Sequence, residues 1–188
     1  MLRATINSLG IVIGVIGLMA IVQVVNDQIG GQLGQFGVLP RSIEHWYHIG
    51  TAPFIHGSYG HLASNALGLL VFGGLTVLRS NKLFIGGSAF IIIVGGTLVW
   101  ALGRPALHVG ASGWIYGLWA LTISIAWFDR KPGNILVALL VLLFYGGMSY
   151  GLLPMKPSVS FEMHIAGVIA GILCGFIYLQ ILNRQSRK

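Results

Sequence analysis

Long apolar runs, separated by short polar or glycine-rich segments, dominate the pattern of hydrophobic and polar positions along this chain. Each run approaches the roughly 20 helical residues needed to cross the hydrocarbon core of a bilayer. The pattern predicts transmembrane helices over about 9–26, 61–78, 83–102, 112–128, 134–153 and 162–182. We therefore expect an all-α polytopic membrane protein, a six-helix bundle that residues 1–188 form as a single domain with no soluble domain beside it.

The composition agrees with this prediction. Hydrophobic residues occupy 55% of the 188 positions, charged residues occupy 8%, and the mean hydropathy is +0.84. These values are typical of polytopic membrane proteins. The first apolar run is flanked by a single Arg3 and lacks a small-residue cleavage site. We therefore expect a retained first helix rather than a removed signal peptide.

The distribution of Lys and Arg predicts the orientation of the bundle, because short cytoplasmic loops retain positive charge during insertion. One side of the predicted bundle carries Arg3, Arg79, Lys82, Arg130, Lys131, Arg184, Arg187 and Lys188, and the other carries Arg41, Arg104 and Lys156. We expect both termini in the cytoplasm and the protein in the plasma (inner) membrane. Topology and anionic inner-leaflet lipid then explain the net charge of +7, and nucleic acid is not expected as a partner.

With this topology, the second, fourth and sixth predicted helices all begin at the outer face, and their first turns carry polar side chains. His61 and Asn65 share one helical face, and so do Ser112 and Tyr116, because residues four apart are neighbours on a helix. His164 begins the sixth helix. All six histidines lie in outer loops or outer helix ends: His45, His48, His56, His61, His108 and His164. Polar groups in membrane helices also form inert hydrogen bonds, but several at one depth favour a functional site.

Glycines on two of these helices predict a close approach between them. Gly113 begins a small-xxx-small pattern on the fourth helix, and His164, Gly167 and Gly171 lie on one stripe of the sixth. Small residues let two membrane helices approach with little side chain between them, whether or not the pair is functional. Such an approach would bring the Ser112 hydroxyl within reach of a histidine on the neighbouring helix.

The inventory of reactive residues excludes several chemistries. The four acidic residues, Asp27, Glu44, Asp129 and Glu162, all lie outside the deep parts of the predicted helices. An intramembrane aspartyl protease or a carboxylate-driven proton pump is therefore excluded. The sequence has no His-Glu-x-x-His string, and His56, His61 and His164 lack an obvious carboxylate to support metal binding. We expect no metal and no other cofactor. Cys174 is the single cysteine, which excludes an internal disulfide.

What remains is a serine activated by a histidine without a buried aspartate. Ser112 does not lie in the Gly-x-Ser-x-Gly elbow of soluble hydrolases, because a Trp stands two positions after it. A neutral His164 would accept the serine proton during attack on a carbonyl and return a proton to the leaving amine. The Ser112 backbone N–H, with the side chains of Asn65 and His61, could stabilise the oxyanion. Tyr116 either packs against the His164 ring or is an ordinary interface aromatic.

The chain resembles the rhomboid family of intramembrane serine proteases over its whole length. The resemblance rests on three motifs in order: His56-Gly57-Ser58-Tyr59-Gly60-His61-Leu62-Ala63-Ser64-Asn65, Gly110-Ala111-Ser112-Gly113, and His164-Ile165-Ala166-Gly167 followed by Gly171. It implies that Ser112 is the nucleophile and His164 the general base. It also implies an oxyanion hole lined by His61 and Asn65, with Tyr116 stacked on the catalytic histidine. Supporting roles follow for His56, Gly110, Gly113, Gly167 and Gly171.

The resemblance also implies the substrate, a single-pass membrane protein cut in or near its transmembrane segment. In the family such substrates enter laterally beside the fifth helix, under the loop that follows it, here about Leu152 to Phe161. Pro154 and Pro157 predict that this loop is non-helical, and they fit either a cap over the site or a simple connector. The aromatic residues of segment 27–60 predict a hairpin that lies partly in the membrane interface. The expected partners are transmembrane substrates and the lipid bilayer.

Two functions of other classes stay open at this point. One is a proteolytically inactive relative that binds and retains transmembrane clients, although this chain keeps both the serine and the histidine. The other is a small transporter or channel, although the predicted helices show no inverted repeats. The sequence leaves the oligomeric state open, because Gly10, Gly14 and Gly17 on the first helix fit either self-association or packing within the bundle.

Overall fold

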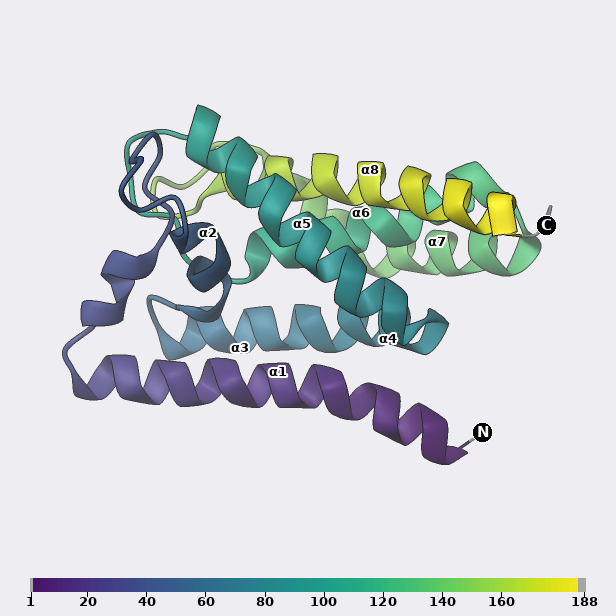
Figure 1. The fold of residues 1–188 in the computed structure, drawn as a ribbon, viewed down its shortest axis with the longest axis horizontal. Coiled ribbons are helices and arrows are strands. Elements are labelled where there is room, and N and C mark those ends of the chain that lie inside the picture. The colour runs from purple at the N-terminus through teal and green to yellow at the C-terminus, as the bar shows by residue number, and fades with distance from the viewer. Residues whose placement is uncertain (1, 186–188) are drawn as a thin grey trace.

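The computed structural model describes residues 2–185 as a bundle of helices joined by loops (Figure 1). The long elements are α1 (Leu2–Gln28), the continuous series α3 (Tyr59–Gly68), η3 (Leu69–Gly73) and α4 (Gly74–Arg79), α5 (Asn81–Leu102), α6 (Ser112–Asp129), α7 (Pro132–Tyr145) with η4 (Gly146–Leu152), and α8 (Phe161–Gln185). Short elements between α1 and α3 are η1 (Gln32–Phe36), α2 (His48–Thr51) and η2 (Ala52–Phe54). Arg187 and Lys188, which entered the charge distribution, lie outside the described residues.

Within this part of the chain, five helices are long and apolar enough to cross a membrane: Ser8–Gln28, Tyr59–Arg79, Asn81–Leu102, Pro132–Leu152 and Phe161–Gln185. They match five of the runs in the hydropathy pattern to within a few residues. The prediction of an all-α multi-pass membrane protein is therefore confirmed at this level. The remaining run, 112–128, forms helix α6, which is not among these five, and its Gly, Ser, Tyr and Trp residues lie between Ile and Leu residues.

The position of α6 explains its composition. It packs against α5, α7 and α8, and 12 of its 18 residues are buried. A helix that is surrounded by other helices needs little apolar surface of its own for lipid. Its buried side chains, with those of α3, α5 and α8, form the main hydrophobic core.

Helices α6 and α8 approach each other closely along a line of glycines. A Cβ atom built on Gly167 would collide with the carbonyl oxygen of Gly113, and one on Gly171 with the carbonyl oxygen of Gly117. Backbone therefore meets backbone at two successive turns, as the small-residue pattern predicts. The glycines of α1 behave differently, because a Cβ on Gly10, Gly14 or Gly17 would meet no described atom within 4 Å. Packing within the bundle therefore does not explain them.

The structure adds detail to one predicted helix and two predicted connecting segments. The run over 134–153 is not one regular helix, because its α-helical part ends at Tyr145 and a 3-10 segment, η4, follows at the Gly146-Gly147 pair. Segment 27–60, for which the sequence predicts a hairpin, contains the three short helical elements η1, α2 and η2. Between η4 and α8 the chain is non-helical over residues 153–160, as the prolines predict.

The bundle places the sequence motifs at one end. Helix α1 begins and α8 ends at the right-hand end of Figure 1, whereas α3, α6 and α8 all begin toward the opposite end (Figure 1). The first turns that carry His61, Ser112 and His164 therefore lie at a common end of the molecule.

Candidate active site

A serine and a histidine from different helices meet at this end of the bundle. Ser112 is the first residue of α6, and His164 lies in the first turn of α8. The Oγ atom of Ser112 is 2.9 Å from Nε2 of His164. The Nδ1 atom of His164 is 2.7 Å from the carbonyl oxygen of Gly151. Because a carbonyl only accepts, Nδ1 carries the ring proton and Nε2 accepts the hydrogen bond from the serine hydroxyl.

The aromatic ring of Tyr116 fixes the plane of the histidine. The Tyr116 and His164 rings are stacked, with centroids 4.0 Å apart and an angle of 7° between the planes. The Tyr116 hydroxyl donates to the Met148 carbonyl at 2.8 Å. A Cβ atom on Gly151 would collide with this hydroxyl. Of the two interpretations of Tyr116, packing against the histidine is therefore the one observed.

The sequence did not predict that backbone carbonyls of η4 would hold the two rings. Met148 and Gly151 hold Tyr116 and His164 through their carbonyl oxygens, and any residue type carries a carbonyl. The only signal was indirect: the glycines at 146, 147 and 151 are unusual in a run otherwise read as a helix.

His61 and Asn65 approach the backbone just before the serine. Gly110 has a φ of 105°, a conformation that favours glycine. A Cβ atom there would also lie against the His61 ring and 3.2 Å from Nδ2 of Asn65. Asn65 is 5% exposed, and its Nδ2 has no hydrogen-bond partner among the described residues. A buried amide without a partner is unfavourable, so this donor is available to a bound group.

His56 is fully buried one layer behind His61. The two rings meet edge to face with centroids 5.0 Å apart, and Asn26 of α1 donates to the His56 carbonyl at 3.4 Å. Burial, reinforced by the nearby His61, lowers the pKa of His56 to about 4. His56 is therefore uncharged at neutral pH. No described contact joins it to Ser112 or His164.

The loop that precedes α8 is held by residues that sequence reasoning did not select. Nη2 of Arg104 donates to the carbonyls of Pro157 and Val159 at 2.9 and 2.8 Å, and its Nε lies 3.2 Å from a carboxylate oxygen of Glu162. Glu162 stands two positions before His164, so Arg104 fastens both the loop and the first turn of α8. A lone Arg in an outer loop gives no sequence signal for this role.

His108 adds a second connection to the same turn. Its Nε2 is 3.1 Å from the Arg104 carbonyl and therefore carries the proton, which leaves Nδ1 to accept from the Ser160 hydroxyl at 2.6 Å. Ser160 Oγ in turn accepts from the Met163 backbone N–H at 3.3 Å. His108 also pairs through its backbone with Val38. The His108 side chain is 1% exposed. Through these contacts His108 joins the loops that carry Val38, Arg104 and Ser160.

We expect Arg104→Gln to release the segment 153–160. The substitution removes two charge-assisted hydrogen bonds and leaves the Glu162 carboxylate without its ion pair. We measure this with a thiol placed by Val159→Cys, since the natural Cys174 is buried. Maleimide labelling at position 159 should become about tenfold faster, which is the effect of ~1.4 kcal/mol on a local opening equilibrium. Equal labelling rates with Arg and Gln at 104 would contradict the role of Arg104, and Lys82→Gln is the control.

No cluster of three or more His, Cys, Asp or Glu side chains within residues 2–185 is arranged to hold a metal ion. The site brings together the N-terminus of α6, the Ser112 hydroxyl, the oriented imidazole of His164 and the buried amide of Asn65.

Comparisons with known proteins agree with the motifs. Residues 43–181 match the family model of the rhomboid domain. An uncharacterized protein of Mycobacterium tuberculosis is 31% identical over 181 residues, which cover 92% of this chain and 75% of that protein. Rhomboid-like protein 11, chloroplastic, of Arabidopsis thaliana is 36% identical over 96 residues, or 49% of this chain and 34% of the plant protein.

A second plant relative, RHOMBOID-like protein 5 of Arabidopsis thaliana, is 28% identical over 159 residues, which are 78% of this chain and 50% of that protein. The chain therefore matches half or less of the length of these two plant proteins. The rhomboid match extends over most of this chain and includes all three sequence motifs. This chain belongs to the rhomboid family of intramembrane proteases.

Proposed function

We propose that this protein is a serine endopeptidase that hydrolyses peptide bonds in or near the transmembrane segments of single-pass membrane proteins. The observation that carries the proposal is the 2.9 Å contact between Ser112 Oγ and the unprotonated Nε2 of His164. That contact gives the serine a base in the correct tautomer, and the Gly151 carbonyl takes the orienting role that an aspartate has in a triad. Family membership supports the same activity.

In the proposed reaction, Ser112 Oγ attacks the carbonyl carbon of the scissile peptide bond while its proton passes to Nε2 of His164. The tetrahedral intermediate collapses when His164 gives that proton to the leaving nitrogen, and an ester to Ser112 remains. Water then attacks the ester with His164 again as base, which releases a carboxylic acid and restores the serine. No metal or other cofactor takes part.

The oxyanion of the intermediate needs donors fixed in advance. We assign this role to the Ser112 backbone N–H at the start of α6, to Asn65 Nδ2 and to His61. The unpartnered state of Asn65 Nδ2 supports the assignment. Gly110, whose φ of 105° brings the backbone against His61 and Asn65, and the glycines Gly113, Gly167 and Gly171 support the geometry. His56 holds His61 from behind as a neutral ring.

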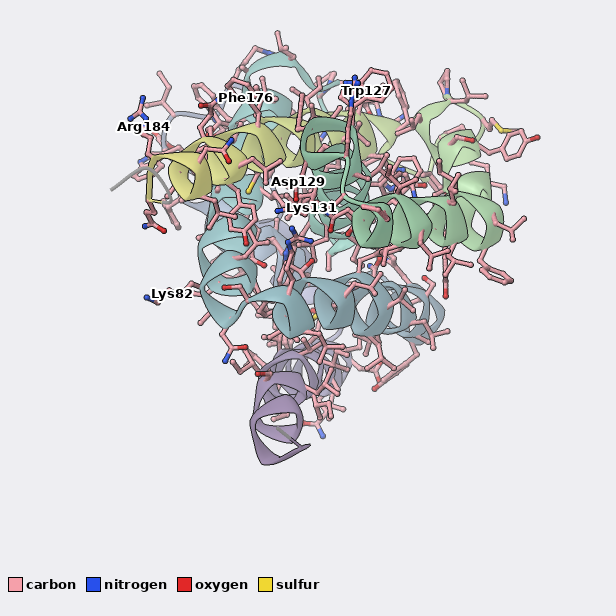
Figure 2. The ribbon with its side chains drawn as sticks, turned by 90° about the vertical axis from the view of Figure 1, so that its right-hand side faces the viewer. Lys82, Trp127, Asp129, Lys131, Phe176 and Arg184 are labelled. Atoms are coloured by element: carbon pink, nitrogen blue, oxygen red, sulfur yellow. The ribbon has the colours of Figure 1, made fainter. Side chains whose placement is uncertain are left out.

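The proposed topology has six membrane crossings, with α6 as the crossing that other helices surround. In this topology the protein lies in the plasma membrane, both of its termini are cytoplasmic, and Ser112 lies toward the outer face. The basic residues support this orientation. Figure 2 looks at the end of the bundle opposite Ser112, and Lys82, Lys131 and Arg184 lie at this end.

In the proposed mechanism the segment 153–160 covers the outer side, so that a substrate helix reaches Ser112 laterally and unwinds there before attack.

The test combines two measurements on the purified full chain in lipid vesicles. A fluorophosphonate probe should label Ser112, and a single-pass reporter should be cut near its outer membrane boundary. Absence of labelling at any probe concentration would indicate a binding protein instead. Solute flux that persists after Ser112→Ala, without reporter cleavage by the wild type, would indicate a transporter.

We expect Asn65→Ala to lower kcat for the reporter by about 100-fold, which is typical for the loss of one oxyanion donor. KM should change little, because the donor acts on charge that develops only in the transition state. The matched control is Ser64→Ala, one position away on the exposed face of α3. A rise in KM at constant kcat would instead assign Asn65 to substrate binding.

A further inference from the structure

A cavity opens at the end of the bundle opposite Ser112, where α4 ends and α7 begins. Its volume is about 300 Å³. Leu75 and Leu78 of α4, Leu121 and Ile125 of α6, and Val137 of α7 form its walls. Leu83 of α5 also lines the cavity, which therefore lies between α4 and α7 with residues of α5 and α6 beside it. Nothing in the proposed catalytic reaction uses this space.

The walls of the cavity offer no free polar group to a ligand. Besides the aliphatic side chains, Thr76 and Thr122 line it. The Thr76 hydroxyl donates to the Phe72 carbonyl at 2.7 Å and the Thr122 hydroxyl to the Leu118 carbonyl at 2.9 Å, each within its own helix. A space of this kind suits hydrocarbon and not ordered water.

One end of the cavity, in contrast, is strongly polar. Arg79 and Asn134 line it there, and Nη1 of Arg79 donates to Oδ1 of Asn134 at 2.7 Å. Asp129 accepts from Asn134 at 2.8 Å, and the Lys131 ammonium lies 3.2 Å from the same carboxylate oxygen. The Arg79 guanidinium is 4.0 Å from this oxygen. A guanidinium has five N–H donors, so Arg79 retains donors for a further acceptor.

The charge around this opening favours an anion. Asp129 is balanced by both Arg79 and Lys131, which leaves the three residues with one net positive charge. Lys82 and Arg130 stand close by in sequence, and Figure 2 shows Lys82, Asp129 and Lys131 at this end of the molecule. Helix α7 begins at Pro132, so the N–H groups of its first turn add partial positive charge beside Lys131.

We propose that this cavity binds one anionic phospholipid, with an acyl chain between α4 and α7 and the phosphate at the polar opening, where it accepts from the remaining donors of Arg79 and is attracted by Lys131. A polar opening above walls of hydrocarbon selects an amphiphile, and the excess of positive charge selects an acidic headgroup. The lipid fills the gap that the side chains of α4 and α7 leave open. The proposed lipid site contains neither Ser112 nor His164. A failure of the lipid proposal would therefore not affect the proposed protease activity, and the reverse is also true.

The experiment counts lipids bound to the purified full chain in detergent by native mass spectrometry, after addition of phosphatidylglycerol and phosphatidylcholine in equal amounts. The wild type should retain one phosphatidylglycerol in preference to phosphatidylcholine. Lys131→Gln, a change at an exposed side chain, should reduce this preference about fivefold, and Arg79→Gln should reduce it at least as much. Arg184→Gln, which removes a charge at the same end but away from the cavity, is the control and should have no effect.

A second variant separates the cavity from the charge. Thr122→Phe fills the space without altering any charged group, and it should abolish retention of phosphatidylglycerol. Unchanged retention in Thr122→Phe or in Lys131→Gln would overturn the proposal. Displacement of the lipid by millimolar inorganic phosphate would also overturn it, because the site would then bind the anion alone. Thermal unfolding of each variant verifies that it is folded.

Discussion

Ser112→Ala, His164→Ala and the double variant should all lose cleavage of a transmembrane reporter to the same residual level. Each single change should reduce the rate by more than about a thousandfold, since residues of one nucleophile and base pair act as a unit. Without His164 the hydroxyl has no acceptor for its proton, and without Ser112 the imidazole has nothing to activate. The effects therefore should not add. The measurement is reporter cleavage by purified protein in vesicles of one lipid composition.

The controls for this prediction lie on the same outer surface. Ser64→Ala removes an exposed hydroxyl, and His45→Ala removes a histidine whose Nδ1 pairs with Ser42 at 2.8 Å. Both should cleave at the wild-type rate. Thermal unfolding should be unchanged in Ser112→Ala, because the serine makes its contact with the His164 ring and not with the core. Cleavage by Ser112→Ala at even a tenth of the wild-type rate would disprove the assignment of the nucleophile.

The contact between Ser112 and His164 was predictable because it depends on features that repeat along a sequence. Hydropathy predicts where helices begin, charge predicts which ends lie together, and a period near four predicts which side chains share a face. Both residues lie in the first turn of a helix. If the predicted start of that helix is wrong by one or two residues, the side chain still lies at the same end of the bundle. The glycines at 167 and 171 then indicate close approach.

The orientation of His164 was not predictable in this way. It is set by the carbonyl of Gly151, in a 3-10 segment that hydropathy reads as the continuation of a helix. Backbone acceptors have no residue identity, so no motif records them. The same limit applies to the hold of Arg104 on the loop, because its two acceptors there, on Pro157 and Val159, are also backbone carbonyls. The sequence therefore predicted the contact between Ser112 and His164 better than it predicted the groups that hold these two side chains in place.

The position of the proposed dyad depends on the α6 and α8 backbones more than on any polar bond. Gly113 directly follows Ser112, and its carbonyl lies against Gly167, three residues after His164. One turn further, the Gly117 carbonyl lies against Gly171. Since no side chain separates the helices there, no rotamer change can absorb an added methyl group. A methyl group must therefore move one helix as a whole.

We accordingly expect Gly171→Ala to impair both stability and cleavage, although position 171 is two turns away from His164. Overpacking of this kind destabilises by about 1–3 kcal/mol, and displacement of the base by even about 1 Å reduces the rate about 100-fold or more. Gly167→Ala should be at least as severe. The measurements are thermal unfolding in detergent and reporter cleavage in vesicles.

Gly14→Ala is the matched control, because it makes the same chemical change in a membrane helix where a Cβ meets no described atom within 4 Å. It should leave cleavage unchanged, and it should keep or slightly raise stability, since Ala favours a helix over Gly by about 1 kcal/mol. Impaired cleavage in both variants would indicate a general sensitivity of the helices to methyl groups. Wild-type cleavage by Gly171→Ala would mean that α6 and α8 can separate without moving the serine from the histidine, and the backbone contact would then not be what positions the dyad.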